Sequence, residues 1–300
     1  MDSIEEKRVY GDRDGALEAY VTSSIGVVRV RVAGDTVGEF GLCERCDARD
    51  VTATDDVVAI ATEEDVRVYD LESGVGSAEG TDDEPTFAET GFGSAVAVGA
   101  DGPDLIAAGD DGRVARRRAG TDRWEPLAAD AVGGADSERP GIGTVRAIDG
   151  DLVGTETGVY RIHDGGLDHA GLTAVNDVST PGVPLAATDD GLYKLGNGWM
   201  EILEESFESV TADPRSEPGR LVRAHATAGD TIYALEGGEW HATGSAGAPI
   251  VAIRYGETVY AVTEDGGFCA TGEGGWRTHP LGIDGVTGLA IAAARSDSSH

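Results

Sequence analysis

Short acidic turns hold the residues that most directly suggest chemistry. The stretch ATDDGLYKLGNGW, residues 187–199, places Asp189 and Asp190 side by side before Gly191. Such a pair could serve a calcium loop, two catalytic acids or a tight turn. A calcium loop of the EF-hand kind alternates its oxygen ligands and ends with a glutamate. Aspartate followed by glycine is instead what a hairpin of two to four residues requires, so we favour the turn.

Two cysteines form a second candidate site. Cys43 and Cys46 make a CxxC in GLCERCDARD, and Cys269 is the remaining cysteine. A zinc site usually needs a second pair of cysteines or a nearby pair of histidines. A redox CxxC normally opens a helix, whereas strands are expected on both sides here. We favour two unpaired thiols and keep metal and redox roles as alternatives.

Other chemical motifs are absent from the sequence. Neither HxH nor HExxH occurs among the histidines, and GxSxG, GxGxxG and Walker A patterns are missing. We therefore predict no catalytic residue, no metal and no cofactor, although ligands contributed by separate strands would escape a search by spacing. The histidines are His163, His169, His225, His241, His279 and His300.

The acidic turn recurs, and its repetition defines the elements that position it. Each copy is a short apolar strand, then Thr or Gly, an acidic turn and a second strand. The shared Thr or Gly falls at positions 22, 62, 109, 155, 188, 227 and 263, with spacings of 33 to 47 residues. Strand hairpins at this spacing are typical of a β-propeller with four strands per blade.

The remaining strands flank these hairpins. An outer strand follows most copies and opens near an aromatic residue: Trp124, Trp199, Trp240 or Trp276. The first copy lacks an inner strand, and VTGLAIAAA, residues 286–294, supplies one from the far end. We predict an all-β, seven-bladed β-propeller with four antiparallel strands per blade, its ring closed by a blade shared between the N- and C-termini, which removes open sheet edges.

The domain boundaries follow from the same repeat. A single propeller domain is expected over residues 15–294, between polar tails at 1–14 and 295–300. Acidic segments rich in Gly and Ser begin at Ser73 and Ala128, and the repeat resumes after each of them. We interpret both segments as long surface loops.

One face of this propeller is expected to gather charged side chains, because each inner strand starts on the face that carries the acidic hairpins. Such side chains are candidates for a binding site at the mouth of the central channel. The alternative, which we favour, is that its side chains pair with each other to satisfy buried charge. The site residues are Arg49, Asp50, Arg146, Asn176, Asp177 and Arg254. The surrounding carboxylates are Glu63, Glu64, Asp110, Asp111, Glu156, Asp189, Asp190, Glu264 and Asp265.

The net charge of −32 restricts the partners and the setting. Acidic residues occupy nearly every expected loop, and 21 arginines accompany two lysines, which indicates a protein from a salt-accumulating haloarchaeon. In molar salt the Debye length falls to about 3 Å, so the repulsion between these acidic side chains is largely screened. No stripe of Lys or Arg could neutralise nucleic-acid phosphates, although docking to a cationic protein stays open. With neither an apolar membrane span nor a secretory signal, we expect a soluble, cytoplasmic protein.

Several of these motifs resemble known propellers. GTETGVYRI and ATDDGLYKL are similar to the blade hairpins of bacterial sensor and BNR-type propellers. Together with IEEKRVYGDRDGALEAYV and GLCERCDARDV, they make almost the whole chain resemble a family of haloarchaeal β-propeller proteins. The resemblance implies a fold and no particular activity. The GH and WD pairs of WD40 blades and the Asp-boxes of sialidases are absent, so no catalytic residue is carried over.

The sequence thus favours a non-catalytic binding module of a halophilic cytoplasm. Its acidic face would bind a protein or a small-molecule ligand. The alternative is a hydrolase or lyase with its site at the mouth of the channel. A third possibility, a passive scaffold, predicts a large exposed apolar patch.

Overall fold

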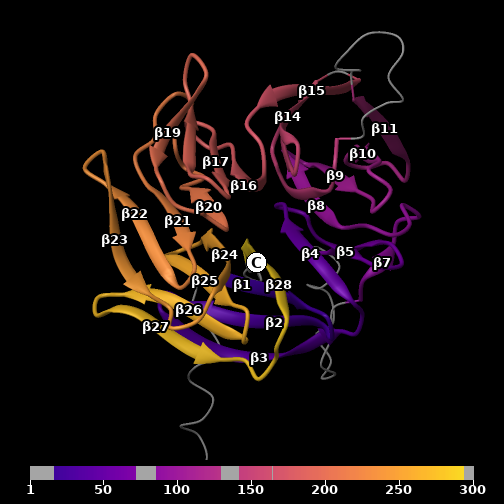
Figure 1. Ribbon diagram of the computed structural model, residues 1–300. Helices are drawn as coiled ribbons and strands as arrows, with labels where there is room; N and C mark the ends of the chain where they lie inside the picture. Colours follow the sequence, from indigo (N-terminus) through magenta and orange to yellow (C-terminus); the bar gives the residue numbers. More distant parts are fainter. Residues whose placement is uncertain (1–16, 72–85, 130–141, 164, 294–300) are drawn as a thin grey trace, which may run out of the picture.

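The computed structural model is built from β-sheets arranged around a central axis (Figure 1). It describes residues 17–71, 86–129, 142–163 and 165–293. The predicted tails, and most of the two predicted loops that begin at Ser73 and Ala128, lie outside these residues. No helix in the described part of the chain is long and apolar enough to cross a lipid bilayer.

Five of the sheets have four antiparallel strands each. One joins β28 (Val286–Ala293), β1 (Leu17–Ser23), β2 (Gly26–Ala33) and β3 (Thr36–Glu44). The next holds β4 (Ala48–Ala53), β5 (Val57–Thr62), β6 (Val66–Asp70) and the short β7 (Ala88–Glu89). A third sheet holds β16 (Val175–Ser179), β17 (Leu185–Thr188), β18 (Leu192–Leu195) and β19 (Trp199–Leu203). A fourth holds β20 (Ser209–Ala212), β21 (Ala224–Ala228), β22 (Thr231–Glu236) and β23 (Glu239–Ser245). The fifth holds β24 (Ile250–Tyr255), β25 (Val259–Thr263), β26 (Gly267–Gly272) and β27 (Gly275–Pro280).

The remaining strands form one eight-stranded sheet in the order β12-β13-β14-β15-β11-β10-β9-β8. They are β8 (Ala97–Asp101), β9 (Asp104–Ala108), β10 (Val114–Arg117), β11 (Trp124–Ala129), β12 (Val145–Asp149), β13 (Leu152–Thr155), β14 (Gly158–His163) and β15 (Gly166–Gly171). Its two halves join where the outer strands β11 and β15 pair in parallel, Ala128 opposite Gly166 and Ala129 opposite Leu167.

This joint corrects the predicted blade count. The all-β propeller is confirmed, but the prediction of seven separate four-stranded blades is wrong: five blades have four strands, and the other eight strands are continuous. Gly166 gives the physical reason, because a Cβ built there would lie 2.5 Å from the carbonyl oxygen of Ala128. A residue with a side chain would therefore keep these two outer strands apart.

The two ends of the described chain share one sheet, as predicted. In Figure 1 the yellow β28 lies beside the indigo β1. Their antiparallel register pairs Leu17 with Ala293 and Thr22 with Gly288, followed by an irregularity before Ser23. β28 thereby supplies the inner strand that the first hairpin lacks in sequence.

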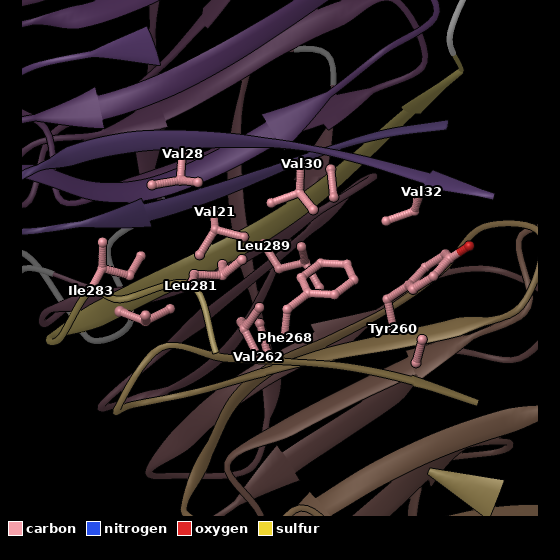
Figure 2. Packing of buried hydrophobic residues seen from close by; sticks show 14 residues of the cluster. Val21, Val28, Val30, Val32, Tyr260, Val262, Phe268, Leu281, Ile283 and Leu289 are labelled. Carbon is pink, nitrogen blue, oxygen red and sulfur yellow. The ribbon is translucent and has the colours of Figure 1, made fainter. Parts of the chain in front are cut away.

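Apolar side chains fill the space between neighbouring sheets, and Figure 2 shows one such cluster beside β28. Val28, Val30 and Val32 alternate along β2 and point to the same side, as the period of two in a strand requires. They pack with Phe268 and with Leu289, which is 1 % exposed. Burial of each such side chain contributes about 1.5–3 kcal/mol, so the shared sheet is fastened by packing as well as by hydrogen bonds.

Tryptophans at the starts of outer strands connect one sheet to the previous one. The indole nitrogen of Trp124 donates to Thr90 Oγ1 at 3.2 Å, and that of Trp199 donates to the Ala170 carbonyl at 2.9 Å. Trp276 packs over Gly244, where a Cβ would lie 2.5 Å from its ring. The aromatic residues that marked the outer strands in sequence therefore also hold neighbouring sheets together.

Candidate functional site

The inner strands enclose a cavity on the central axis. β28, β4, β8, β12, β16, β20 and β24 follow one another around it, each in contact with the next. The cavity has a volume of about 300 Å³. Five of the six predicted site residues line it: Asp50, Arg146, Asn176, Asp177 and Arg254. Asp149, which the sequence analysis did not single out, lines it as well.

A β-bulge near the start of several inner strands places three of the predicted residues. The register shifts across Arg49 in β4, across Arg146 in β12 and across Asn176 in β16. A bulge leaves one residue without a partner in the ladder and re-aims its side chain, and bulges often lie next to functional sites. The bulges therefore turn these three side chains away from the regular alternation of the strand.

Arg49 is the predicted residue that the cavity does not include. Its Nη1 approaches Ser94 Oγ at 3.4 Å and the Ala95 carbonyl at 3.5 Å, both in the segment before β8. Ser94 Oγ in turn donates to Asp110 at 3.2 Å. Arg49 thus connects two neighbouring sheets and is not part of the channel lining.

Two aspartates bind the backbone of the next inner strand. Asp50 accepts hydrogen bonds from the Val51 nitrogen at 2.8 Å and, across to β8, from the Val98 nitrogen at 2.9 Å. Asp177 makes the same kind of contact three inner strands further round the ring, because its Oδ2 accepts from the Val210 nitrogen of β20 at 3.0 Å. These carboxylates act as fasteners between neighbouring inner strands.

Asp149 and Arg254 complete the polar lining. Asp149 Oδ2 accepts from the backbone nitrogen and the hydroxyl of Thr180, at 2.6 and 2.8 Å. Arg254 donates to the Ile253 carbonyl at 2.9 Å and lies 3.8 Å from Asp177. The predicted pairing of channel charges therefore holds for Arg254 and Asp177.

Burial in the channel changes the acidity of its carboxyls. Desolvation raises the pKa of Asp50 to about 7, opposed by its two backbone hydrogen bonds and by the positive charge of Arg254. The pKa of Asp149 is raised for the same main reason. A proton held by Asp50 reduces the negative charge that Arg254 must balance.

Arg146 and Asn176 extend the channel toward the acidic hairpins. Arg146 Nη1 donates to Asn176 Oδ1 at 2.6 Å, and its Nη2 lies 3.6 Å from Glu156. Asn176 Nδ2 donates to Asp189 at 2.9 Å and to the Phe207 carbonyl at 3.0 Å. The channel and the hairpins are therefore joined by one set of polar contacts.

The acidic hairpins are turns, as predicted, and threonine hydroxyls fasten those at Thr62, Thr155 and Thr188. Thr188 Oγ1 donates to the Gly191 carbonyl at 2.9 Å and accepts from the Gly191 nitrogen at 3.0 Å. Thr62 and Thr155 do the same in their own hairpins. The carboxylates that these turns carry are all exposed: Glu63, Glu64, Asp110, Asp111, Glu156, Asp189, Asp190, Glu264 and Asp265. We call this set the acidic rim.

In the copies of the repeat at positions 22 and 227, the turn begins one residue later than the repeat predicts. Ser23, not Thr22, donates to the carbonyl three residues ahead, at Gly26. In the other copy Ala228 pairs with Thr231 across the turn, which leaves Thr227 inside the strand. The hydroxyls of Thr22 and Thr227 are buried without a hydrogen-bond partner, which shows that the threonine alone does not mark the turn.

The cysteines lie among apolar neighbours. Cys43 and Cys46 pack against the cluster between the first two sheets, and all three cysteines are free thiols. Burial raises the pKa of Cys43 to about 12 and that of Cys46 to about 11, so both are neutral thiols near pH 7. Over the described ranges, no group of three or more His, Cys, Asp or Glu side chains could hold a metal ion.

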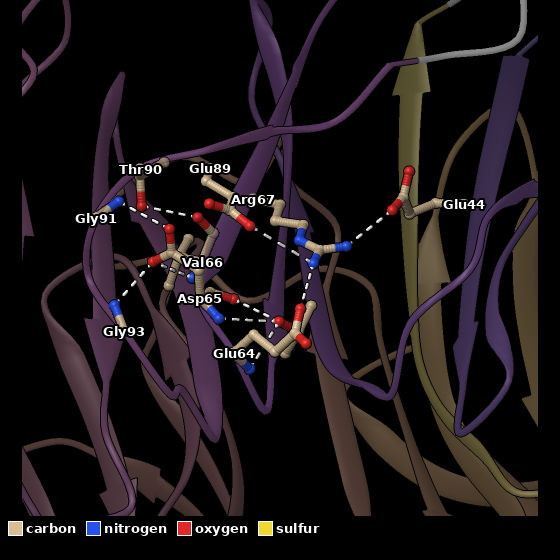
Figure 3. Close-up of polar contacts among 10 residues, drawn as sticks. Glu44, Glu64, Asp65, Val66, Arg67, Glu89, Thr90, Gly91 and Gly93 are labelled. Carbon is tan, nitrogen blue, oxygen red and sulfur yellow. Dashed lines mark hydrogen bonds and ion pairs between the residues drawn. The ribbon is translucent and has the colours of Figure 1, made fainter.

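A second polar centre lies at the rim beside β6 (Figure 3). Arg67 contacts Glu44 at 2.8 Å, Glu64 at 2.6 Å and Glu89 at 3.8 Å. The buried Asp65 accepts from the backbone nitrogens of Gly91 and Gly93, both at 2.8 Å. Each carboxylate here has a fixed donor, so the cluster holds the loop before β8 against the hairpin.

The closed ring of sheets around a polar channel defines a β-propeller. A family profile described as "Beta-prop_HVO_0234:-like, beta propeller" matches residues 3–292. The chain therefore belongs to this β-propeller family, which confirms the resemblance drawn from its motifs. No protein of curated function matches the sequence.

Solved propellers share the fold at low sequence identity. The WD40 β-propeller domain of Doa1 aligns with a TM-score of 0.60 and 16 % identity, over 81 % of this chain and 86 % of that one. Apo AztD from Citrobacter koseri gives 0.62 and 9 %, over 93 % and 99 %. YCF48 bound to D1 peptide gives 0.51 and 14 %, over 78 % and 82 %. At such identities the likeness shows the fold alone.

Proposed function

We propose that the protein is a non-catalytic binding module whose acidic rim docks a protein partner. One contrast carries the proposal. The polar side chains inside the channel are held by each other and by backbone, whereas the rim carboxylates are exposed and those of Glu63, Asp190 and Glu264 have no ion pair or hydrogen bond within the described ranges. Groups that are already fixed as structural acceptors are poorly placed to transfer protons. These three exposed carboxylates are therefore available to a partner.

Rigidity of the rim supports recognition. Each Thr-fastened hairpin fixes the backbone that carries its carboxylates before a partner arrives, so less backbone entropy is lost on binding. Negative charges arranged around one face attract a basic surface and raise the rate at which the two proteins associate. The partner that fits this rim is a protein with clustered lysines or arginines.

The relatives in structure are consistent with a binding role. YCF48 was solved bound to D1 peptide, and another propeller neighbour comes from the structure of the Mitotic Checkpoint Complex. The alternative, a hydrolase or lyase at the channel mouth, would need a carboxyl free to exchange protons. Asp50 has a pKa of about 7, but both of its oxygens accept backbone hydrogen bonds.

The test compares two triple variants of equal charge change. One neutralises the rim through Glu63→Gln, Asp190→Asn and Glu264→Gln. Its control neutralises Asp122→Asn, Glu236→Gln and Glu273→Gln, exposed residues near the turns that precede outer strands, on the opposite face. Proteins captured from the source cells by the wild type are identified by mass spectrometry, and their affinities for all three forms are then measured.

We expect the captured partner to bind the control as it binds the wild type and to bind the rim variant at least about tenfold more weakly. Equal affinity for the rim variant would contradict the acidic-rim proposal. Capture of no protein, together with turnover of a sugar or lactone library that Asp50→Asn abolishes, would establish the enzyme alternative instead.

A further inference from the structure

The loop between β20 and β21 differs from the corresponding loops of other sheets. It spans residues 213–223, whereas the connection from β4 to β5 spans 54–56 and that from β24 to β25 spans 256–258. It follows the end of an inner strand, so it lies on the face opposite the acidic rim. Long ordered loops on a rigid scaffold often carry binding residues.

Backbone contacts fix the shape of this loop. The Asp213 nitrogen donates to the Arg223 carbonyl at 3.0 Å, and the Gly219 nitrogen donates to the Gly182 carbonyl of a neighbouring loop at 2.7 Å. Gly182 has a φ of +71°, and a Cβ there would lie 2.4 Å from the Arg220 carbonyl oxygen. The loop is thereby held against the adjacent sheet by a glycine that permits close approach.

One buried carboxylate holds two guanidinium groups side by side. Asp213, 6 % exposed, accepts from Arg215 Nε at 2.9 Å and Nη2 at 2.8 Å, and from Arg223 Nη1 at 3.4 Å. The hydrogen bonds from Arg215 hold the pKa of Asp213 below its usual range. Arg223 also lies over the ring of Tyr255, 5.5 Å from its centroid. A guanidinium has five N–H donors, so both arginines keep donors for a ligand.

A second cavity, of about 260 Å³ and open to solvent, lies against the same loop. Arg220 and Ser216 line it together with the three residues of the carboxylate–guanidinium group. Arg220 is exposed and has no ion pair in the described part of the chain, and Ser216 Oγ is buried without a hydrogen-bond partner. With Glu217, the lining carries three positive and two negative side chains, a local excess of positive charge in a chain of net charge −32.

We propose that this cavity binds the phosphate group of a small ligand. Guanidinium forks match the geometry of phosphate oxygens and bind them bidentately. The orphan hydroxyl of Ser216, buried in this structure, supplies a neutral donor by rotating toward the ligand, and Arg220 supplies a charge that no carboxylate of the described residues balances. A phosphate, with more acceptor oxygens than a carboxylate, uses more of these donors. The exposed Val222 offers an apolar edge for the organic part of the ligand.

The experiment is calorimetric titration of the full chain with inorganic phosphate and, separately, with acetate at the same ionic strength. The variants are Arg220→Gln and Ser216→Ala. Arg118→Gln serves as the control, because Arg118 has a side chain that is 56 % exposed and lies outside this loop. Melting temperatures establish that each form is folded, and the two variants test the site independently of each other.

We expect saturable phosphate binding that weakens about tenfold, or ~1.4 kcal/mol, in each variant and is unchanged in the control. Acetate should bind the wild type at least about tenfold more weakly than phosphate. Absence of saturable phosphate binding, equal affinity in Arg220→Gln and the control, or acetate binding as tight as phosphate would each overturn the proposal. Because the loop and the acidic rim lie on opposite faces, this outcome does not depend on the outcome of the rim experiment.

Discussion

The carboxylate of Asp177 on β16 accepts a hydrogen bond from the backbone nitrogen of Val210 on β20, 3.0 Å away. The two residues lie in different sheets, so this bond fixes the position of one sheet relative to the next. The same Oδ2 accepts from Ser209 Oγ at 2.7 Å. A single side chain thus satisfies two donors of its neighbour at the wall of the channel.

Replacing Asp177 should lower stability. Asp177→Ala leaves the Ser209 hydroxyl and the Val210 nitrogen without a partner in a buried setting, which costs about 1–3 kcal/mol. The free energy of unfolding in urea measures this cost. Asp190→Asn, at an exposed position of the rim, serves as the control and should change stability by less than ~0.5 kcal/mol. Equal stability of the two variants would show that the contact across the sheets contributes nothing.

The raised pKa of Asp50 predicts a dependence of stability on pH. The folded protein holds this proton up to about pH 7, whereas an unfolded aspartate releases it near ~3.9. The stability that Asp50 contributes is therefore greatest below the unfolded pKa and declines as pH rises toward about 7.

Asp50→Asn removes this titration. The difference in unfolding free energy, wild type minus variant, should fall steadily between about pH 4 and about pH 7. Urea unfolding at several pH values measures it, and the corresponding difference for Asp190→Asn should stay flat. A constant difference for Asp50→Asn over this interval is the result that contradicts the prediction.

The joint between β11 and β15 should depend on the absence of a side chain at Gly166. Gly166→Val places a side chain against the Ala128 carbonyl and should cost about 1–3 kcal/mol, as overpacking usually does. Gly165→Val is the matched control, since a Cβ at Gly165 meets no atom within 4 Å. Urea unfolding gives the cost, and faster amide exchange in β15 would show that the joint itself has opened.

Removal of β28 should prevent closure of the ring. Deleting residues 286–300 exposes the edge of β1 and removes the buried Leu289, and open edges promote aggregation. We expect an aggregating or misfolded product in size-exclusion chromatography. Deleting residues 295–300 alone should leave the elution volume close to that of the full chain. A monomeric 1–285 form with an unchanged melting temperature would disprove the closure.

The hairpins and the closure were predictable because each has a local signal in the sequence. Thr62, Thr155 and Thr188 fasten their turns with their own hydroxyls, so the residue type and the turn coincide. The displaced copies show the limit of this signal, because Ser23 takes over the role that Thr22 was expected to have. A hydroxyl one residue away is chemically equivalent and shifts the pattern.

The joint between the two halves of the eight-stranded sheet could not be predicted from a local signal in the sequence. It depends on the lateral distance between β11 and β15, which are separated in the chain by three complete strands. A glycine such as Gly166 is compatible with a turn, a bulge or a close approach, and the sequence alone does not distinguish them.

The candidate sites were predicted unevenly. Polar residues near the starts of inner strands identified the channel, but their use as fasteners between sheets depends on the partner strand. Arg49 was assigned to the channel and points to a neighbouring sheet instead. The cavity that we propose for phosphate was not predicted, although in PRSEPGRLVR three arginines fall within a stretch of nine residues in an otherwise acidic chain. The signal available in the sequence was this local concentration of positive charge in a chain of net charge −32.

The sheet shared by β28 and β1 also determines when this protein can finish folding. Among the described strands, the ribosome makes β1, β2 and β3 first and β28 last. The inner edge of β1 therefore has no β28 to pair with while the other sheets are being synthesised. A partly synthesised chain that lacks β28 cannot complete the sheet with β1. β28 therefore distinguishes a complete chain from an incomplete one, because a chain that ends before it exposes an unpaired strand edge that promotes aggregation.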